Sequence, residues 1–482
     1  MPHPTGKSEG RQTRREESEG GIVLGAWESH AQGEGRPRFQ AIRSGRSPHA
    51  EEETGTYAGL ERIAHKAKAA PRERLTALSH HLTVEYLRET YSLMNRRGAP
   101  GVDRVSMQEY GMNLDANLTD LVSRMKRRAY DAPPVRRVYI PKAGSTGKMR
   151  PLGIPAVEDR LLQAAVARML SAIYEPLFRD ASYGFRPGRG ARDALRQVRG
   201  AVMRAGAQYV YEADIRGFFD HLDHAWLMRM LELKIGDPWI LRLVQKWLKA
   251  GILEGGTVTH PEAGAPQGGP LSPVLANVYL HYVLDLWFDK VVRPGLRGNA
   301  TLVRYADDFL IVLDDAADAQ QVAALVPERL AKFGLEVAPE KTRLIPFGRA
   351  CWRRGENAGN FDFLGFRHIL GTSRQGQAVL VRRPGKKGVH RFLMEVKQWL
   401  GTHMHLPPRL QQRALKAKLQ GFYQYYGLRH CTDVLAHVQY WILWIWARTL
   451  RRRSQVHRPN WEQMGRYPWY KLPSPKVLHP DV

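Results

Sequence analysis

The sequence contains only two cysteines, Cys351 and Cys431, among 482 residues. Two thiols cannot supply the disulfide framework of a small secreted domain, and no Cys-x-x-Cys spacing is present for zinc. The histidine pairs at 80–81 and 221/224 have no further ligand set beside them, and no Gly-rich Walker loop occurs. The scarcity of cysteine therefore favours a reducing, intracellular setting and a fold without a zinc site.

Long apolar runs are also missing from the sequence. The densest apolar cluster, Trp441 to Trp446, is far shorter than the roughly 20 residues that a membrane-spanning helix needs. The N-terminal region has no apolar core of the signal-peptide type, and the glutamates among its arginines are untypical of an organellar transit peptide. We therefore expect a cytoplasmic protein with no membrane partner.

Acidic residues are the minority among the charged side chains. The chain has 73 Lys plus Arg against 47 Asp plus Glu, a formal net charge of +26. Such an excess of positive charge indicates a polyanionic partner, and nucleic acid is the favoured one. Because 43% of the residues are hydrophobic, the chain also has ample material for the core of a globular protein.

Composition divides the chain into four parts. Residues 1–58 are rich in Gly, Arg, Glu and Ser with few large apolar residues, which predicts a mostly disordered leader. Residues 59–375 mix strand and helix patterns, and residues 376–453 are predominantly helical. Residues 454–482 form a basic tail that is a candidate DNA-binding segment. The predicted fold class is therefore α+β, followed by an all-α region.

Local patterns predict individual elements within the α+β part. Strands are expected at 136–142 and 208–214, where β-branched and aromatic residues alternate or cluster. A long helix is predicted at 157–178, and an earlier helix from residue 82 is expected to end at Gly98.

Three further helices are predicted near 389–400, 407–427 and 432–453. One face of the last helix is apolar and is predicted to pack on the core. The residues of that face are Val434, Val438, Trp441 and Ile445.

The stretch RYADDFLIVLDD, residues 304–315, places Asp307 and Asp308 between two apolar, strand-like runs. Adjacent aspartates at a hairpin tip are commonly turn residues without a catalytic role. The flanking runs lack polar alternation, however, so both strands are expected to be buried on two faces, where an unneutralised carboxylate is costly. A cation is therefore expected there, and a metal ion is the simplest candidate.

A third carboxylate, Asp214, ends the apolar run 209–213 and precedes a turn. Alone it is more typical of a helix cap than of a metal ligand. Together with Asp307 and Asp308 it suits phosphoryl transfer, in which two Mg²⁺ ions activate a 3′-hydroxyl and stabilise the leaving pyrophosphate.

Five sequence blocks bear on the identity of the chain: YADD, DIRGFFD, GAPQGGPLSPVLANVYL, RPLGIPAVEDRLLQ and SYGFRPGRGARDAL. Together they resemble the group II intron-encoded reverse transcriptases, also called maturases, and the resemblance runs from about Leu60 to the C-terminus. It implies a right-hand polymerase with fingers and palm at 59–375 and an all-α thumb (maturase or X region) at 376–453. It also implies that Asp214, Asp307 and Asp308 are the catalytic ligands of two Mg²⁺ ions.

The resemblance implies a nucleotide site as well. Phe219 matches an aromatic gate that excludes a ribose 2′-hydroxyl, although a buried Phe is more often simply part of a core. Lys142 and Arg150 match residues that hold the incoming triphosphate, and Gln267 and Lys341 match residues near the nucleotide. Without the resemblance, these basic residues would be read as solvated surface and Gln267 as part of a turn.

Two further contact regions are implied. Leu364 and Gly365 in FDFLGF match the primer-grip hairpin, where glycine permits close backbone approach. Arginines near the end of the last predicted helix suit contact with structured RNA, and equally suit a solvated helix end that matches the helix dipole. These arginines are Arg448, Arg451, Arg452 and Arg453.

The expected function is RNA-directed DNA synthesis coupled to binding of a group II intron RNA, assistance of its splicing, and copying of the intron into DNA during retrohoming. The expected partners are the intron RNA template, a DNA primer or target, and dNTPs. The chain carries no ligands of the HNH endonuclease that some members have, which implies priming from an existing DNA 3′ end. A free-standing or defence-associated reverse transcriptase is the alternative, and a non-catalytic RNA chaperone is the reading least compatible with the intact aspartates.

Overall fold

A computed structural model describes most of the chain after the predicted leader. The described residues are 57–141, 149–260, 263–265, 268–356, 358–453 and 460–482. Two predicted nucleotide-site residues, Lys142 and Gln267, lie outside the described residues, as does nearly all of the predicted disordered leader.

The N-terminal part is a group of helices around one central helix. Its helices are α1 (Ala58–Ala69), α2 (Val84–Leu93), α3 (Met107–Met112), α4 (Leu114–Lys126) and α5 (Val157–Tyr174). Helix α5 is the predicted long helix, and it is buried over most of its circumference. It contacts α1, α2 and α3, so it forms the centre of this helical core.

A small sheet has the strand order β2-β1-β4-β5, and its strands β1 and β2 lie between α4 and α5 in the chain. The strands are β1 (Val135–Pro141), β2 (Met149–Ile154), β4 (Ile252–Glu254) and β5 (Thr257–Thr259). Strand β1 confirms the strand predicted at 136–142 and pairs with β2 in an antiparallel ladder.

The second sheet carries the predicted aspartates and has the strand order β6-β7-β3-β8. Its strands are β6 (Ala300–Tyr305), β7 (Asp308–Leu313), β3 (Tyr209–Asp214) and β8 (Arg343–Pro346). All three strand pairs are antiparallel, and β3 and β7 are the two inner strands. We call it the central sheet.

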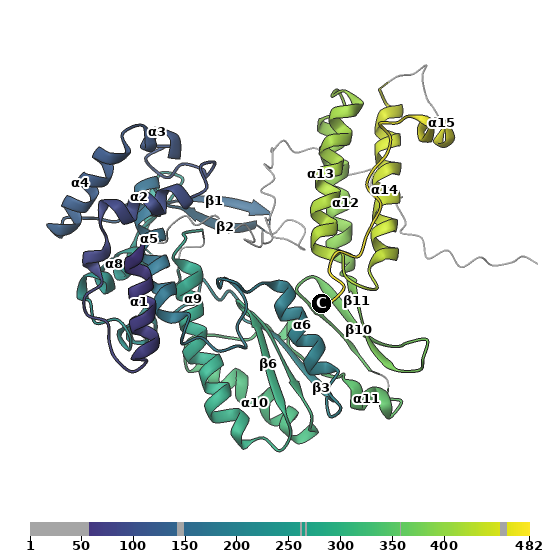
Figure 1. The fold of residues 1–482 in the computed structure, drawn as a ribbon, viewed down its shortest axis with the longest axis horizontal. Helices are drawn as coiled ribbons and strands as arrows, with labels where there is room; N and C mark the ends of the chain where they lie inside the picture. Colours follow the sequence, from purple (N-terminus) through teal and green to yellow (C-terminus); the bar gives the residue numbers. More distant parts are fainter. Residues whose placement is uncertain (1–56, 142–148, 261–262, 266–267, 357, 454–459) are drawn as a thin grey trace, which may run out of the picture. The chain divides into compact units, whose positions relative to one another are not determined.

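Both faces of the central sheet are covered. Along β7, Phe309, Ile311 and Leu313 belong to one core cluster, whereas Leu310 and Val312 belong to a second. Helix α10 (Ala316–Ala331) contacts β3 and β7, and helix α6 (Ala191–Val202) contacts β6 and β7 (Figure 1). Burial on both faces explains why the sequence of β7 has no polar alternation, and it confirms that expectation.

The remaining helices of this region join the two sheets. They are α7 (His224–Glu232), α8 (Pro238–Lys249) and α9 (Ser272–Leu280), and α9 continues into the π-helical turns η3 (His281–Asp285) and η4 (Phe288–Val292) and the 3₁₀ turn η5 (Arg293–Gly295). Short 3₁₀ turns also occur at η2 (Ser79–His81) and η6 (Pro339–Lys341).

A third sheet and three long helices form the C-terminal part (Figure 1). The strands are β9 (Asn360–Phe363), β10 (Phe366–Thr372) and β11 (Ala378–Pro384), and the helices are α11 (Arg349–Arg353), α12 (Lys386–Thr402), α13 (Pro408–Tyr426), α14 (Thr432–Arg451) and α15 (Trp461–Arg466). The boundary expected at residue 375 falls between β10 and β11, which pair with each other, so the helical region begins at Lys386.

Two element predictions need correction. Helix α2 ends at Leu93, before Gly98, because Met94 is extended and the Asn95 side chain accepts a hydrogen bond from the Arg97 amide. The buried face of α14 is also displaced from the predicted one, since among the four predicted residues only Val438 is buried. The buried face consists of Leu435, Val438, Ile442, Trp446 and Ala447.

The described part of the predicted basic tail packs on the C-terminal core. Met464, Tyr470 and Leu472 are buried in the same cluster as Trp446, whose ring centroid lies 5.0 Å from that of Tyr470. The DNA-binding role of this segment stays a prediction. Within the described ranges, no helix is both long enough and apolar enough to cross a bilayer.

Candidate active site

Three aspartates meet at one end of the central sheet. Asp214 is the last residue of β3, Asp308 is the first residue of β7, and the two are direct register partners. Asp307 precedes Asp308 in the tight β6–β7 turn, where Ala306 has a φ of +59°. Partners across an antiparallel pair have Cα atoms about 4.5–5.5 Å apart, so strand pairing places residues from distant parts of the sequence at one point.

Burial and neighbouring negative charge raise the pKa of two of these carboxylates, Asp307 and Asp308. Burial, followed by the charges of Asp214 and Asp307, raises the pKa of Asp308 well above its usual value. Burial also raises the pKa of Asp307, and the Asp214 charge adds to this effect, whereas Arg150 and Lys341 oppose it. Such a concentration of negative charge favours a cation at this end of the sheet.

Lys341, at the end of η6, forms an ion pair with Asp214. Burial alone would lower the pKa of Lys341, but the hydrogen bond with Asp214 and the charges of the three aspartates raise it above its usual value. The ammonium group therefore supplies counter-charge to one of the three carboxylates. From the sequence, Asp214 was expected to bind metal and Lys341 to lie near the nucleotide, and this contact shows that the two side chains meet.

The donor atoms suit Mg²⁺, which prefers hard oxygen ligands and takes few protein carboxylates because water and phosphate oxygens complete its shell. The carboxylates, however, do not form a complete metal site in the described structure. Among the described residues, no group of three or more His, Cys, Asp or Glu side chains is already placed to hold a metal ion. Since Lys341 is about half exposed, its side chain has freedom to leave Asp214 when a cation binds.

A fourth acidic residue, Glu212, lies two positions before Asp214 on the same face of β3. It is buried, and its carboxylate accepts a hydrogen bond from Arg343 Nη2 at 2.6 Å. It also accepts one from the Asp362 amide at 3.4 Å, which connects β9 to the central sheet. Glu212 was not among the residues predicted from the sequence, although an acidic residue within an apolar strand was a usable signal.

Besides Lys341, two of the predicted nucleotide-site residues, Arg150 and Phe219, are described. Arg150 is exposed on β2, and its charge lowers the pKa of Asp307. Phe219 is half-buried, with its ring edge-on to Phe218 at a centroid distance of 5.3 Å. Its carbonyl accepts a hydrogen bond from the Ala265 amide at 2.8 Å, so this residue is tied to the segment that precedes Gln267.

The predicted primer-grip residues form the turn between β9 and β10. Leu364 and Gly365 both have positive φ, +51° and +75°, as in a two-residue type I′ hairpin. The Tyr425 hydroxyl of α13 donates to the Leu364 carbonyl at 2.8 Å, and the Gly385 amide donates to the Gly365 carbonyl at 2.9 Å. Burial raises the pKa of Tyr425, and the negative charge of Asp308 adds a smaller contribution, so this anchor lies near the aspartates.

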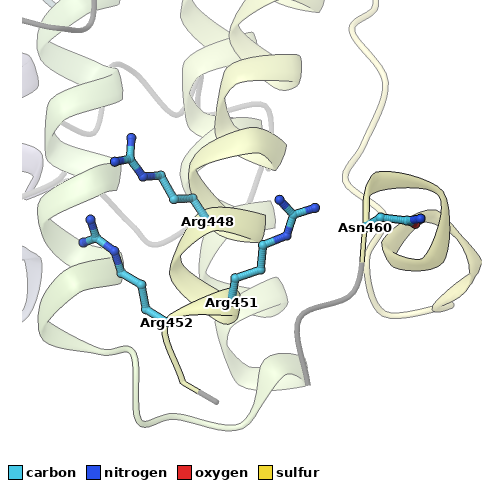
Figure 2. Close-up of a pocket in the computed structure, with 4 residues that line it drawn as sticks. All are labelled: Arg448, Arg451, Arg452 and Asn460. Carbon is cyan, nitrogen blue, oxygen red and sulfur yellow. The ribbon is translucent and has the colours of Figure 1, made fainter. Parts of the chain in front are cut away.

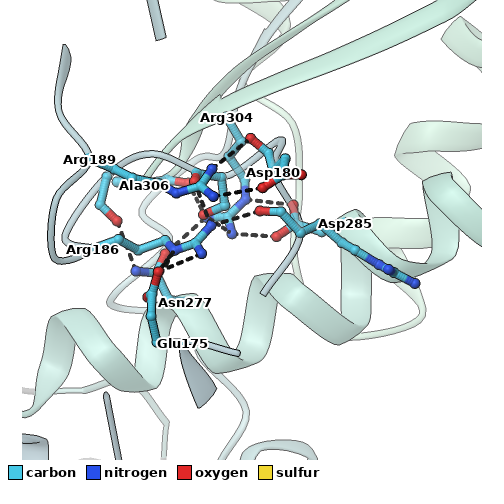
Figure 3. Close-up of polar contacts among 11 residues, drawn as sticks. Glu175, Asp180, Arg186, Arg189, Asn277, Asp285, Arg304 and Ala306 are labelled. Carbon is cyan, nitrogen blue, oxygen red and sulfur yellow. Dashed lines mark hydrogen bonds and ion pairs between the residues drawn. The ribbon is translucent and has the colours of Figure 1, made fainter. Parts of the chain in front are cut away.

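A buried arginine braces the turn that carries Asp307 and Asp308. Arg304 of β6 is completely buried, and its guanidinium group binds both oxygens of the equally buried Asp285 at 2.7 and 2.5 Å (Figure 3). The same group donates to Ser182 Oγ, to Asn277 Oδ1, and to the carbonyl of Ala306 within the turn. This network was not predicted from the sequence, although a charged residue inside the apolar run ATLVRY was a signal for it.

The predicted RNA-binding arginines separate into two groups. Arg448, Arg451 and Arg452 surround a pocket of about 510 Å³ at the end of α14, with Asn460 of the next segment on its other side (Figure 2). Arg453 does not line this pocket, because its guanidinium group donates to the Leu406 carbonyl at 3.1 Å. The pocket gathers three positive charges at a surface, which suits a phosphate-bearing ligand.

Comparison with known proteins agrees with this geometry. The family model described as reverse transcriptase (RNA-dependent DNA polymerase) matches residues 140–368, which include all three aspartates. Group II intron-encoded protein LtrA of Lactococcus lactis subsp. cremoris is 40% identical over 237 residues, covering 48% of this chain and 39% of LtrA. The chain thus spans about two fifths of the length of LtrA.

Two further relatives extend the comparison. Protein YkfC of Escherichia coli K12 is 32% identical over 356 residues, covering 66% of this chain and 90% of YkfC. An uncharacterized 91 kDa protein in the cob intron of Schizosaccharomyces pombe is 30% identical over 285 residues, covering 48% of this chain and 35% of that protein. Because the reverse transcriptase model matches the chain and these relatives are similar to it, the chain belongs to the family of group II intron-encoded reverse transcriptases.

Proposed function

We propose that this protein is an RNA-directed DNA polymerase that copies a group II intron RNA by a two-metal mechanism. The observation that carries the proposal is the register pairing of Asp214 with Asp308, with Asp307 adjacent in the turn. Two carboxylates whose pKa is raised by burial and then by neighbouring negative charge, Asp307 and Asp308, next to cationic side chains, are suited to binding divalent cations and a nucleoside triphosphate.

The side chains around the aspartates have distinct proposed roles. Asp214, Asp307 and Asp308 would hold two Mg²⁺ ions, which when bound activate the primer 3′-hydroxyl and neutralise charge on the leaving pyrophosphate. Arg150 and Lys341 would contact the triphosphate, Arg150 through its planar fork and Lys341 after exchanging Asp214 for phosphate oxygens. Lys142 and Gln267 are proposed for the same site on the basis of the family resemblance alone.

The sheets and helices fit the parts of a right-hand polymerase in the same proposal. The central sheet would be the palm, because it carries the aspartates at one end. The N-terminal helices with the β2-β1-β4-β5 sheet would be the fingers, and α12, α13 and α14 would be the thumb. The β9–β10 turn would hold the primer strand, since its backbone is anchored by Tyr425 near Asp308.

Intron RNA binding and assistance of splicing form the second half of the proposal. Splicing chemistry in group II introns belongs to the RNA, so the protein would act by gripping and stabilising the folded intron. The net charge of +26 and the arginine pocket at the end of α14 support phosphate contact. The printed names of LtrA and of the cob-intron protein place those relatives in introns.

The proposal is tested by two assays on the full-length protein and on Asp307→Ala. Primer extension on an annealed RNA template measures DNA synthesis, and release of ligated exons from the intron RNA that flanks the reading frame measures splicing. Asp307→Ala should lose extension and keep splicing, because RNA gripping needs no polymerase metals. Asp315→Asn is the matched control, since Asp315 is a helix cap of α10 and asparagine caps equally well.

Two outcomes would contradict the proposal. If the unmodified protein does not extend a primer on RNA in Mg²⁺, the polymerase assignment is wrong. If it extends primers but releases no ligated exons from the flanking intron RNA, the splicing role is wrong, and the protein is a reverse transcriptase without maturase activity.

A further inference from the structure

Phe185 has two properties that are uncommon together. Its side chain is 53% exposed, and its backbone is in the left-handed region, with a φ of +58°. An exposed phenylalanine gains little from burial, and a left-handed conformation costs free energy for any residue with a Cβ. Such a conformation persists only where the surrounding structure imposes it, and such positions cluster at functional sites.

The residue before Phe185 is held against the catalytic turn. The Gly184 carbonyl accepts a hydrogen bond from Asn277 Nδ2 at 2.8 Å, and Asn277 also binds Arg304 of the brace. A Cβ on Gly184 would lie 2.6 Å from the amide nitrogen of Ala306, so only glycine allows this close approach. Gly184 contacts this turn, and consecutive Cα atoms are about 3.8 Å apart, so the backbone of Phe185 lies one residue away from the turn that carries Asp307.

The residue after Phe185 is held equally firmly. The side chain of Arg186 is buried, and its guanidinium group binds both oxygens of Glu175 (Figure 3). It also donates to the carbonyls of Arg179 and Ser182 at 2.7 and 2.8 Å. Hydrogen bonds therefore hold the residues on both sides of Phe185, while the Phe185 side chain itself is exposed.

The described structure offers no internal reason for an aromatic ring at this position. Phe185 belongs to neither hydrophobic core cluster, and no ring contact or cation–π contact of its side chain is found among the described residues. An exposed ring whose neighbours in sequence are held in place beside the catalytic turn is suited to stacking on a base or sugar, because every nucleobase has a π-face.

We propose that Phe185 stacks on the primer–template at the catalytic turn and fixes the terminal base pair beside Asp307 and Asp308. This inference rests on the proposed polymerase function. Stacking on a base is worth about five-fold to over a hundred-fold in affinity for the strand. Because the residues on both sides of Phe185 are held by hydrogen bonds, the backbone at this position needs little further ordering when the nucleic acid binds.

The test compares four substitutions at this position in the full-length protein. Phe185→Trp keeps an aromatic face, Phe185→Leu keeps apolar bulk without a ring, and Phe185→Ala and Phe185→Gly remove the side chain. Phe185→Gly also relieves the left-handed backbone, so a ring with no binding role should be dispensable in this variant. His430→Gly is the matched control, since His430 is another exposed ring with positive φ, +66°, located between α13 and α14.

The probe is an annealed RNA template and DNA primer with 2-aminopurine either at the primer 3′ end or at the opposing template position. Its fluorescence responds to stacking, so the two labels identify the strand that the ring contacts. We expect Phe185→Ala, Phe185→Gly and Phe185→Leu to raise the dissociation constant at least about five-fold. We expect Phe185→Trp and His430→Gly to stay within about two-fold of the unmodified protein.

Thermal unfolding separates this role from a structural one. Phe185→Gly should unfold at the same temperature as the unmodified protein or higher, while binding the primer–template more weakly. The inference is overturned if the unmodified protein extends primers but Phe185→Gly or Phe185→Leu binds as tightly as it does, or if neither label reports a loss of stacking. If the unmodified protein itself does not extend primers, the failure belongs to the proposed function.

Discussion

Arg304 and Asp285 form a bidentate ion pair with both side chains fully buried, directly behind the turn that carries Asp307 and Asp308. Arg304 comes from β6, whereas Asp285 ends the π-helical turn that continues α9. Because the same guanidinium group also holds the Ala306 carbonyl, the pair connects the fold of the protein to the shape of its candidate active site.

Asp285→Asn should therefore destabilise the protein by about 3–5 kcal/mol, because it leaves a buried guanidinium group without its counter-charge. The free energy of unfolding in urea measures the loss. Asp115→Asn is the control, since the Arg88–Asp115 pair is exposed and contributes at most about 1 kcal/mol. If Asp285→Asn lowers the free energy of unfolding no more than Asp115→Asn does, the buried pair is not a stabilising element.

Asp308→Asn should abolish DNA synthesis while the protein stays folded. The substitution keeps the shape of the side chain and removes the negative charge that a metal ion would neutralise. Primer extension in Mg²⁺, with folding followed by circular dichroism, gives the result. Normal extension by this variant would rule out Asp308 as a metal ligand.

Phe219→Ala should relax discrimination against ribonucleotides. Removing the ring would open space beside the sugar, so the ratio of kcat/KM for dNTP to kcat/KM for rNTP should fall on the order of ten-fold or more. Phe219→Tyr keeps the ring and should keep the ratio. A ratio that is unchanged in Phe219→Ala would mean that this residue only packs against Phe218.

Replacing Arg448, Arg451 and Arg452 with Ala should weaken RNA binding mainly at low salt. Each phosphate contact contributes about 0.9 to the slope of log affinity against log salt for duplex DNA and about 0.7 for single strands, so losing three should flatten the slope by roughly two. Equilibrium binding of the intron RNA at several salt concentrations measures the slope. Primer extension on a short duplex should change less.

The control for that experiment removes three positive charges elsewhere. Arg62, Lys66 and Lys68 are exposed on α1 and lie outside both candidate sites. If their replacement with Ala flattens the salt dependence equally, then RNA binding depends on net charge alone, and the pocket at the end of α14 has no special part in it.

Stability should fall in mild acid because of His281. Burial, opposed by Asp285 and reinforced by the charges of Arg304, Arg179 and Arg186, lowers the pKa of His281 to about 4. The folded protein thus keeps this ring neutral, and its contribution is present above the unfolded-state pKa of about 6.5 and is lost as the pH falls toward 4. The difference corresponds to about 3 kcal/mol.

The pH effect is measured by the free energy of unfolding between pH 7 and pH 4. His281→Phe should flatten this dependence, since a phenyl ring fits beside Phe178 and binds no proton. A variant as acid-sensitive as the unmodified protein would assign the loss to other groups, among them His368, whose pKa burial lowers to about 3.

The sequence by itself determined several features of this protein. The apolar runs on either side of Asp307 and Asp308 predicted a hairpin buried on two faces, and β6 and β7 have that form. The helix breakers Pro408 and Gly427 bounded α13 correctly. These features depend on backbone preference and on the period of apolar residues, which are local properties of the chain.

Only the tertiary structure decided which distant residues meet. The register of β3 against β7 set Asp214 beside Asp308, and the packing of α9 and β6 set Asp285 against Arg304. The buried face of α14 likewise depended on its neighbours, because Trp441 is half-buried whereas Trp446, on another side of the same helix, is buried. Long-range pairing follows from the summed packing of whole elements, so no local pattern in the sequence specifies it.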